Sequence, residues 1–394
     1  MAFEIDKNDD GFDISDDFQM STKLMVFGVG GAGGNAVEHM VNSGIVDVEY
    51  VIANTDVMAL RKKDGSKMAR IQIGRKTTHG QGAGNDPTRG KASAEENHDE
   101  IAEKLEGVSM LFIAAGMGGG TGTGAAPVVA SIAREMGILT VGVVTKPFNW
   151  EGAFKMETAI SGVSEMKKYV DALIVIPNDR LKELKGAKIT MKNAFAEVDN
   201  ILCKAVSGVI RLVQGNGYIN VDFADICMAL RTSGIAHMAI GHGKGDDMIN
   251  DALDEVLNSP LLETSIDGAR RCLLNISIPN SDSFGFDSCE SITNLIAQRI
   301  NPNAQFKAGF EFDDTLSDDE ISIILIATDF AEEDEPVKVA GISSSNNEQS
   351  QSQSQAASVT VTPTSEGLSG NVGFSEPNDI DALLRKFNQG RGMD

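Results

Sequence analysis

A run of glycine and threonine, Gly116 to Gly124, follows the apolar segment 108–115 and precedes a predicted helix. The helix is indicated by residues 125–130, with Pro127 near its start. A glycine loop between a strand and a helix presents free backbone N–H groups, and the missing Cβ atoms let a polyphosphate approach closely. Threonine hydroxyls can donate to the same phosphate oxygens. We therefore expect phosphate contacts from Gly116, Gly118, Gly119, Gly120, Thr121, Gly122, Thr123 and Gly124.

A second glycine-rich turn follows the first predicted strand, residues 23–29. Gly28, Gly30 and Gly33 have the G-x-G-x-x-G spacing of dinucleotide-binding folds, which is compatible with NAD, FAD or another phosphate ligand. What the spacing predicts in each case is phosphate at the N-terminus of the following amphipathic helix. The candidate contacts are Gly30, Gly31, Ala32, Gly33, Gly34 and Asn35.

Polar residues also follow the other predicted strands of the N-terminal half, at 50–53, 69–73, 138–145 and 172–176. Strands that alternate with helices predict an α/β fold with a doubly wound, mostly parallel sheet, whose ligands bind at the carboxyl ends of the strands. We therefore expect these residues to meet at one edge of the sheet. They are Asn54, Glu151 and Asn178, beside the glycine loops, and the loop with Gly82, Ala83 and Gly84 follows the strand at 69–73. Asp56 fits as the N-cap of a helix over 57–62, and residues 74–92 are expected to form a long loop before a helix over 93–105.

A long amphipathic helix is predicted over residues 191–214. Phe195 and Asp199 are four residues apart and so share one face near its N-terminal end. After this helix, Asn220, Asp222 and Asp225 precede another predicted helix. From their spacing alone, these carboxylates could either cap that helix or take part in chemistry.

Composition limits the class of protein. The chain of 394 residues carries a net charge of −23, which argues against binding nucleic acid. No apolar run approaches the ~20 residues needed to span a bilayer, so direct membrane insertion is not expected. The four cysteines and five histidines lack metal-site spacing, so we predict no protein metal site and expect free thiols in a cytoplasmic protein.

The predicted organisation begins with an acidic, disordered arm at 1–21, followed by a nucleotide-binding domain at 22–190. A central helix at 191–215 joins it to a smaller α+β domain at 216–330, with strands near 236–241, 273–278 and 321–328 and helices near 246–257 and 287–299. A disordered linker follows at 331–375, because this segment is rich in Ser, Gln, Asn and Glu. Residues 376–394 regain helical periodicity and read as a partner-binding peptide.

Taken in order, the two glycine loops, Asn178, Asp199 and the segment Asn220 to Asp225 resemble the tubulin/FtsZ family of GTPases over residues 22–330. The resemblance implies that the bound nucleotide is GTP or GDP, with Mg²⁺. It implies that Phe195 stacks on guanine and that Asp199 accepts from guanine N1–H and N2–H. By the same resemblance Asn178 contacts the base, Glu151 the ribose, Lys155 the nucleotide, and Asn54 and Asp56 the phosphates and cation. Residues 82–84 would cover the γ-phosphate.

The resemblance further implies a head-to-tail homopolymer that forms the ring at the mid-cell division site of bacteria. Asp222 and Asp225, with Asn220, would complete the active site of the neighbouring subunit, and the tail peptide would bind membrane-tethering and regulatory division proteins. Lys155, Asn85 and Asp86 depart from the family pattern, so one alternative is a filament protein that hydrolyses GTP weakly. The other alternative, from the Gly28–Gly33 spacing, is an NAD- or FAD-dependent oxidoreductase.

Overall fold

The computed structural model describes residues 22–183, 190, 193–214, 222–259, 266, 268–279, 284–314 and 316–330. The predicted N-terminal arm, linker and tail peptide, together with Asn220, lie outside the described residues. None of the helices described is long and apolar enough to cross a membrane.

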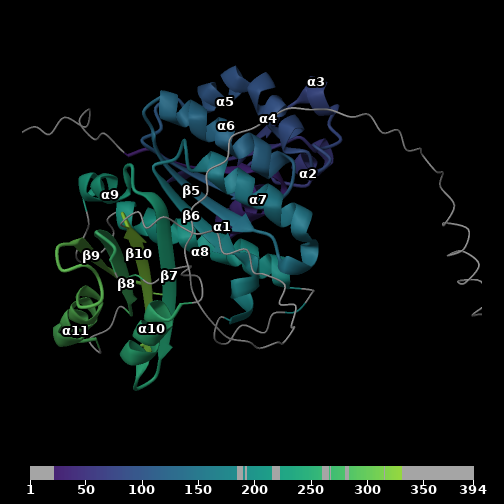
Figure 1. The fold of residues 1–394 in the computed structure, drawn as a ribbon. Helices are drawn as coiled ribbons and strands as arrows, with labels where there is room; N and C mark the ends of the chain where they lie inside the picture. The colour runs from purple at the N-terminus through teal and green to yellow at the C-terminus, as the bar shows by residue number, and fades with distance from the viewer. Residues whose placement is uncertain are drawn as a thin grey trace, which may run out of the picture. The chain divides into compact units, whose positions relative to one another are not determined.

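The strands form one ten-stranded sheet in the order β3-β2-β1-β4-β5-β6-β7-β10-β8-β9 (Figure 1). Neighbouring strands from β3 to β7 pair in parallel, which confirms the predicted doubly wound, mostly parallel sheet. Beyond β7 the pairing becomes antiparallel on both sides of β10, and β8 and β9 pair in parallel. The strands are β1 (Leu24–Val29), β2 (Val48–Asn54), β3 (Ala69–Gln72), β4 (Met110–Gly116), β5 (Leu139–Lys146), β6 (Ala172–Pro177), β7 (Gly234–Lys244), β8 (Arg271–Ile278), β9 (Gln305–Phe312) and β10 (Glu320–Thr328).

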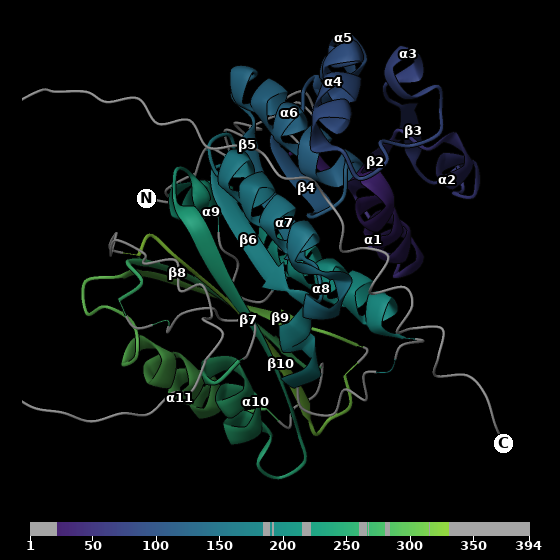
Figure 2. The ribbon, with the colours of Figure 1, turned by 45° about the vertical axis from the view of Figure 1, so that its right-hand side comes forward.

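Helices cover both faces of this sheet because its strands are apolar on both sides. The α-helices are α1 (Gly30–Asn42), α2 (Val57–Arg61), α3 (Arg75–Thr78), α4 (Pro87–Glu96), α5 (His98–Leu105), α6 (Thr121–Glu135), α7 (Ala153–Met166), α8 (Ala194–Gln214), α9 (Phe223–Leu230), α10 (Met248–Leu257) and α11 (Phe286–Ala297). Alternate residues of β1 and β4 pack against α1 and α8 on one face and against α5, α6 and α7 on the other. A third core lies between β7, β8 and β10 and the helices α10 and α11 (Figure 2).

The helix α8 packs against both parts of the sheet. Its apolar face shares a core with β1, β4 and β6 and also with Leu273, Ile324 and Ile326 of the antiparallel part. A Cβ on Gly208 would lie 2.6 Å from Ile324 Cδ1, so the helix approaches β10 closely at this point. This confirms the predicted core helix over its described residues.

Three local predictions were wrong. The loop predicted over 74–92 contains α3 and the start of α4, because Asp86 accepts from the backbone N–H of Thr88 (2.9 Å) and Pro87 occupies the first turn. The helix predicted over 93–105 is the C-terminal part of α4 followed by α5. The helix after the glycine loop begins at Thr121, so Pro127 lies inside α6 rather than near its start. In addition, β9 was not predicted.

Candidate functional site

The two glycine loops touch each other through their backbones. Gly30 has a φ of +76°, and a Cβ on this residue would lie 3.0 Å from the backbone N of Gly122. A Cβ on Gly122 would in turn lie 2.4 Å from the carbonyl oxygen of Gly116. Glycine is required at these positions because no side chain fits between the backbones.

Other glycines of the same loops face open space. A Cβ added to Gly31, Gly34 or Gly119 would meet no atom within 4 Å. Gly31 and Gly34, three residues apart on α1, line a small cavity of about 30 Å³ together with Asn54. The first turns of α1 and α6 carry no acidic residue, so the positive ends of both helices remain available to an anion. This open, positively polarised cradle fits the phosphates of a nucleotide.

Alanine substitutions at a tightly packed glycine and at a glycine that faces open space should separate effects on folding from effects on GTP binding. In Gly33→Ala the new Cβ would lie 2.2 Å from the carbonyl oxygen of Ala114, so we expect the free energy of unfolding to fall by about 1–3 kcal/mol. Gly34→Ala meets no such clash and gains up to about 1 kcal/mol of helix propensity. We expect it to fold normally but to bind GTP about tenfold or more weakly, because the methyl group intrudes into the cradle. Denaturant unfolding without nucleotide and titration with GTP measure the two effects. Wild-type GTP affinity in Gly34→Ala would contradict the assignment of the cradle.

The segment that contains Gly82, Ala83 and Gly84 lies beside the glycine loop at 116–124. The backbone N of Gly82 donates to Thr55 O (3.4 Å), and that of Val57 donates to Gly80 O (3.1 Å). A Cβ on Gly120 would lie 2.8 Å from Ala83 Cβ, so the two segments are in close contact.

Asp56 is an N-cap, which confirms one of its two predicted roles. Its Oδ1 accepts from the backbone N–H groups of Met58 (2.8 Å) and Ala59 (3.2 Å). The side chain of Asn54 accepts from the backbone N of Asp56 (3.1 Å). These bonds fix the turn at the carboxyl end of β2, and Asn54 lines the same small cavity as Gly31 and Gly34.

Asn178 follows β6 at the same edge. Its side chain is buried, and its Oδ1 has no hydrogen-bond partner among the described residues. A buried, unpaired amide oxygen is costly unless a ligand donates to it. A nucleobase with an N–H or amino group supplies such a donor, so this orphaned oxygen supports the predicted base contact.

Asp199 is half-buried on α8, and burial raises the pKa of its carboxyl group to about 6. The charge of Lys63 opposes this rise in pKa, while that of Glu38 adds to it. Four residues earlier, the ring of Phe195 is exposed and meets the rings of Phe148 and Trp150 edge-on, at 5.9 and 6.3 Å between centroids. An apolar ring and a carboxylate thus project from the same end of α8.

Glu151 and Lys155 pair with each other. Lys155 Nζ lies 3.1 Å from Glu151 Oε2, while Glu151 Oε1 accepts from the backbone N of Phe148 (2.9 Å). The backbone carbonyl oxygen of Lys155 would lie 2.8 Å from a Cβ on Gly118, so the first turn of α7 packs against the glycine loop at 116–124. The structure therefore places Glu151 and Lys155 beside this loop.

Asp222 and Asp225 lie far from this site, towards the amino ends of the parallel strands. They belong to the start of α9, whose other end leads into β7, and Gly234 of β7 pairs with Ala172, the first residue of β6. The glycine loops, by contrast, follow the last residues of β1 and β4. The six-residue β6 separates the two edges by roughly 20 Å.

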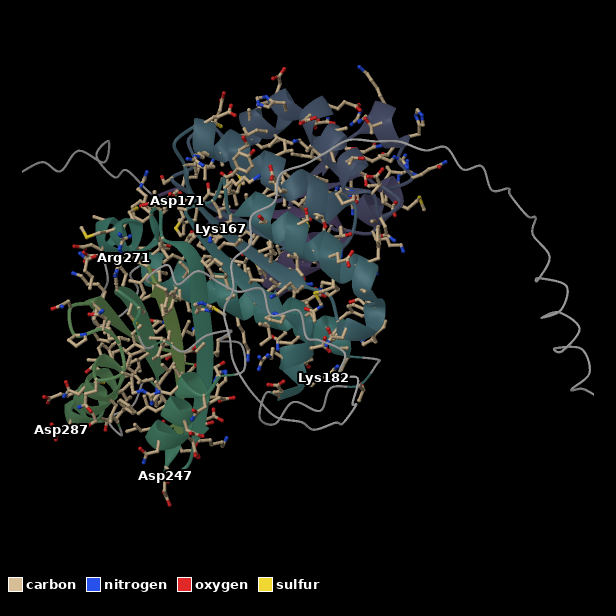
Figure 3. The ribbon with its side chains drawn as sticks, in the orientation of Figure 1. Lys167, Asp171, Lys182, Asp247, Arg271 and Asp287 are labelled. Carbon is tan, nitrogen blue, oxygen red and sulfur yellow. The ribbon has the colours of Figure 1, made fainter. Side chains whose placement is uncertain are left out.

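Figure 3 shows this separation through three labelled side chains. Asp171 precedes β6 and Lys182 follows it, and the two residues lie well apart in this view. Arg271 lies on the side of Asp171, and its Nη1 donates to the carbonyl oxygens of Met228 (3.0 Å) and Arg231 (3.1 Å) at the end of α9. The carboxylates of α9 are therefore remote from the glycine loops of their own chain.

Sequence reasoning missed two residues of the site. Lys63 lines the small cavity and binds Asn35 Oδ1 and Glu38 Oε2, each at 2.7 Å. The hydroxyls of Thr55 and Thr121 are 2.7 Å apart, and this hydrogen bond joins the turn after β2 to the glycine loop at 116–124. Thr55 lies between Asn54 and Asp56, which the family resemblance had already marked, whereas nothing in the local pattern distinguishes Lys63 from neighbouring surface lysines.

Comparison with known proteins covers both halves of the chain. Residues 23–186 match the Tubulin/FtsZ family, GTPase domain, and residues 234–331 match the FtsZ family, C-terminal domain. The chain is 43% identical over 325 residues to the cell division protein FtsZ of Wigglesworthia glossinidia brevipalpis, covering 82% of this chain and 83% of that protein. It is 44% identical over 319 residues to the cell division protein FtsZ of Aquifex aeolicus, covering 81% and 86%. An FtsZ dimer from M. jannaschii has a similar structure, with a TM-score of 0.74 and 37% identity over 78% of this chain and 88% of that chain.

These matches do not support the NAD- or FAD-dependent oxidoreductase. The Gly28–Gly33 spacing belongs to the segment that matches the GTPase domain. The similarity to this family extends through the antiparallel part of the sheet. The glycine loops and the unpaired side-chain oxygen of Asn178 are features expected of a nucleotide site. The chain is a GTP-binding and GTP-hydrolysing protein of the cell-division cytoskeleton, and it belongs to the tubulin/FtsZ family.

Proposed function

We propose that the chain hydrolyses GTP at a site shared by two subunits of a head-to-tail filament. The observation that carries this proposal is the position of α9, because Asp222 and Asp225 lie at the edge of the sheet opposite the glycine loops. A second subunit stacked on the first would bring its α9 to that nucleotide. Each contact then joins unlike surfaces, and repetition of such a contact gives an open polymer.

In the proposed complex one subunit binds and orients the nucleotide. The N-termini of α1 and α6 bind its phosphates, and Thr121 and Thr123 add hydroxyl donors. Asn178 and Asp199 bind the guanine and Phe195 packs against its face, while Glu151 binds the ribose and Lys155 the nucleotide. Bound Mg²⁺ would neutralise phosphate charge. Among the described residues no three His, Cys, Asp or Glu side chains gather to hold a metal ion, so the phosphates themselves would supply much of its coordination.

The neighbouring subunit supplies the groups that act on water. Asp222 is exposed at the start of α9, and Asp225 lies in the first turn of the same helix. Their carboxylates would accept hydrogen bonds from a water molecule and orient it in line with the γ-phosphate. We infer the same role for Asn220 from the sequence alone. The rate gain would come mainly from positioning and from electrostatic stabilisation.

The place of action and the partners rest on family resemblance. We infer that the filaments act in the cytoplasm, at the mid-cell division ring. Residues 376–394 would bind membrane-tethering and regulatory proteins as a short helix with Ile380, Leu383, Leu384 and Phe387 on one face.

The test is the rate of GTP hydrolysis against protein concentration, with sedimentation in parallel. A shared site predicts that the rate per molecule is near zero in dilute solution and rises as GTP-dependent pelleting begins. A rate per molecule that stays constant down to the most dilute sample would show that the site is complete within one chain. Pelleting with slow hydrolysis at every concentration would instead favour the weakly hydrolysing alternative.

A further inference from the structure

Asp225 is paired with a lysine from a distant part of the chain. Lys307 of β9 places its Nζ 3.0 Å from Asp225 Oδ2, and the two side chains are 48% and 27% exposed. The two residues are far apart in the sequence, and the pair is not explained by helix propensity or by helix capping. It joins the carboxylate proposed to act on water to the edge strand of the sheet.

The opposite end of α9 is fixed by several hydrogen bonds. Arg271 donates to two carbonyl oxygens there, and Thr328 Oγ1 donates to Ala229 O (3.0 Å). At the N-terminal end, the side chain of Asp222 makes no capping hydrogen bond within the described part of the chain, and Ile226 is buried in the core. The ion pair with Lys307 therefore adds a polar contact to the apolar packing that holds the first turn of α9.

Strand register explains why both cations reach this helix. In the parallel pair β8–β9, Arg271 is opposite Gln305 and Leu273 is opposite Lys307. Paired residues of parallel strands point to the same face, and residues two apart on one strand also share a face. Arg271 and Lys307 thus lie on one face of neighbouring strands, close to the two ends of α9.

Charge gives the pair a second consequence. The chain carries a net charge of −23, and the proposed contact brings Asp222 and Asp225 towards a triphosphate. Like charges at such short range repel, and the repulsion grows as the contact excludes water. A lysine already paired with Asp225 offsets part of this repulsion. As a half-exposed pair in a free subunit, it adds little to folding stability.

From these observations we propose that Lys307 is a positioning residue of the shared active site. It holds Asp225 at the angle at which the carboxylate meets the neighbouring subunit's nucleotide, and it offsets the negative charge that Asp225 brings there. This inference rests on the proposed function, since it concerns how Asp225 is presented and not whether Asp225 acts.

The test compares Lys307→Met and Lys307→Arg with a matched control, Lys244→Met. Lys244 forms a surface ion pair with Glu320 (2.6 Å), with side chains 64% and 28% exposed. The pair joins the last residue of β7 to the first residue of β10, at the ends of these strands that are far from α9. We expect Lys307→Met to lower kcat per assembled subunit about tenfold or more, with an unchanged KM for GTP and an unchanged Tm. Lys307→Arg should recover most of the rate, and Lys244→Met should behave as wild type.

Two results would overturn the inference. One is a wild-type kcat per assembled subunit in Lys307→Met. The other is a loss of rate that comes with a lower Tm and is shared by Lys307→Arg, which would indicate a structural role. Asp225→Ala, measured beside these variants, separates this inference from the proposed function. If Asp225→Ala is inactive and Lys307→Met is fully active, only the role of Lys307 fails; if Asp225→Ala is fully active, the shared site itself fails.

Discussion

Asp225→Ala is expected to bind GTP and assemble, yet to hydrolyse GTP about 10²- to 10⁴-fold more slowly per assembled subunit. Asp225 lies in the first turn of α9, at the edge of the sheet remote from the glycine loops, so its removal leaves the nucleotide cradle of the same chain intact. What is lost is the carboxylate that orients water at the neighbouring nucleotide. Steady-state phosphate release, normalised to pelleted protein, measures this loss.

The matched control is Asp251→Ala. Asp251 also lies in the first turn of a helix of the C-terminal half, α10, so this variant loses a comparable interaction with the helix dipole. We expect it to retain the wild-type rate. Weakened GTP binding by Asp225→Ala as a dilute, unassembled protein would count against the separation of the two surfaces.

Mixing variants extends the same experiment. Asp225→Ala retains its nucleotide cradle, and Gly34→Ala retains its α9. In filaments assembled from equal amounts of the two variants, about a quarter of the contacts would join an intact nucleotide site to an intact α9. Hydrolysis should therefore reappear on mixing. Two inactive proteins that remain inactive in co-sedimenting filaments would argue against completion of the site by a neighbour.

Asp199→Asn is expected to weaken GTP binding by about 10²-fold or more. An ionised carboxylate accepts from both guanine N1–H and N2–H, whereas an amide offers one acceptor and presents an N–H donor that faces another donor. Xanthine carries a carbonyl oxygen in place of the guanine amino group, and the new amide can donate to it. The variant should therefore prefer xanthosine triphosphate over GTP, and competition between the two nucleotides measures the change.

The same residue predicts the pH dependence of binding. Burial raises the pKa of Asp199 to about 6, so the group is mostly ionised at pH 7 and protonated below pH 6. Because GTP requires the ionised form, its affinity should fall about tenfold for each pH unit below 6 and level off above 7. Asp199→Asn should lack this dependence. A wild-type affinity that is flat between pH 5 and 7 would exclude Asp199 as the base acceptor.

The parts of the fold that were predictable are those encoded locally. The strands of the parallel half are continuous apolar runs, and each glycine loop lies between such a run and a helix. The early start of α4 also had a local signal, Asp86 before Pro87, which the glycine-rich surroundings outweighed. The start of α6 did not, because Thr121 to Gly124 have poor intrinsic helix propensity and become helical through contact with α4, where a Cβ on Gly124 would lie 2.0 Å from Pro87 O.

The parts that could not be predicted depend on register between distant strands. β9 alternates Phe306, Ala308, Phe310 and Phe312 with Gln305, Lys307, Gly309 and Glu311, so the strand itself had a local signal that was overlooked. Its partner and register are not encoded locally, because they come from its pairing with β8. The ion pair between Lys307 and Asp225 exists only once that pairing is set. The residues that local sequence patterns identify are those proposed to touch the nucleotide, whereas the residues that position them are brought there by tertiary structure.

The junction between β6 and β7 bears on how a filament carries load. Only three residue pairs join these strands, against seven between β4 and β5. The backbone pairing of the sheet is therefore sparsest where its two halves meet. In the proposed filament, part of any tension that passes between the nucleotide end of a subunit and α9 would cross this seam. The packing of α8 against strands on both sides of the seam links the two halves of the sheet a second time. Apolar side chains along this one helix therefore supplement the backbone where the two halves share the fewest paired residues.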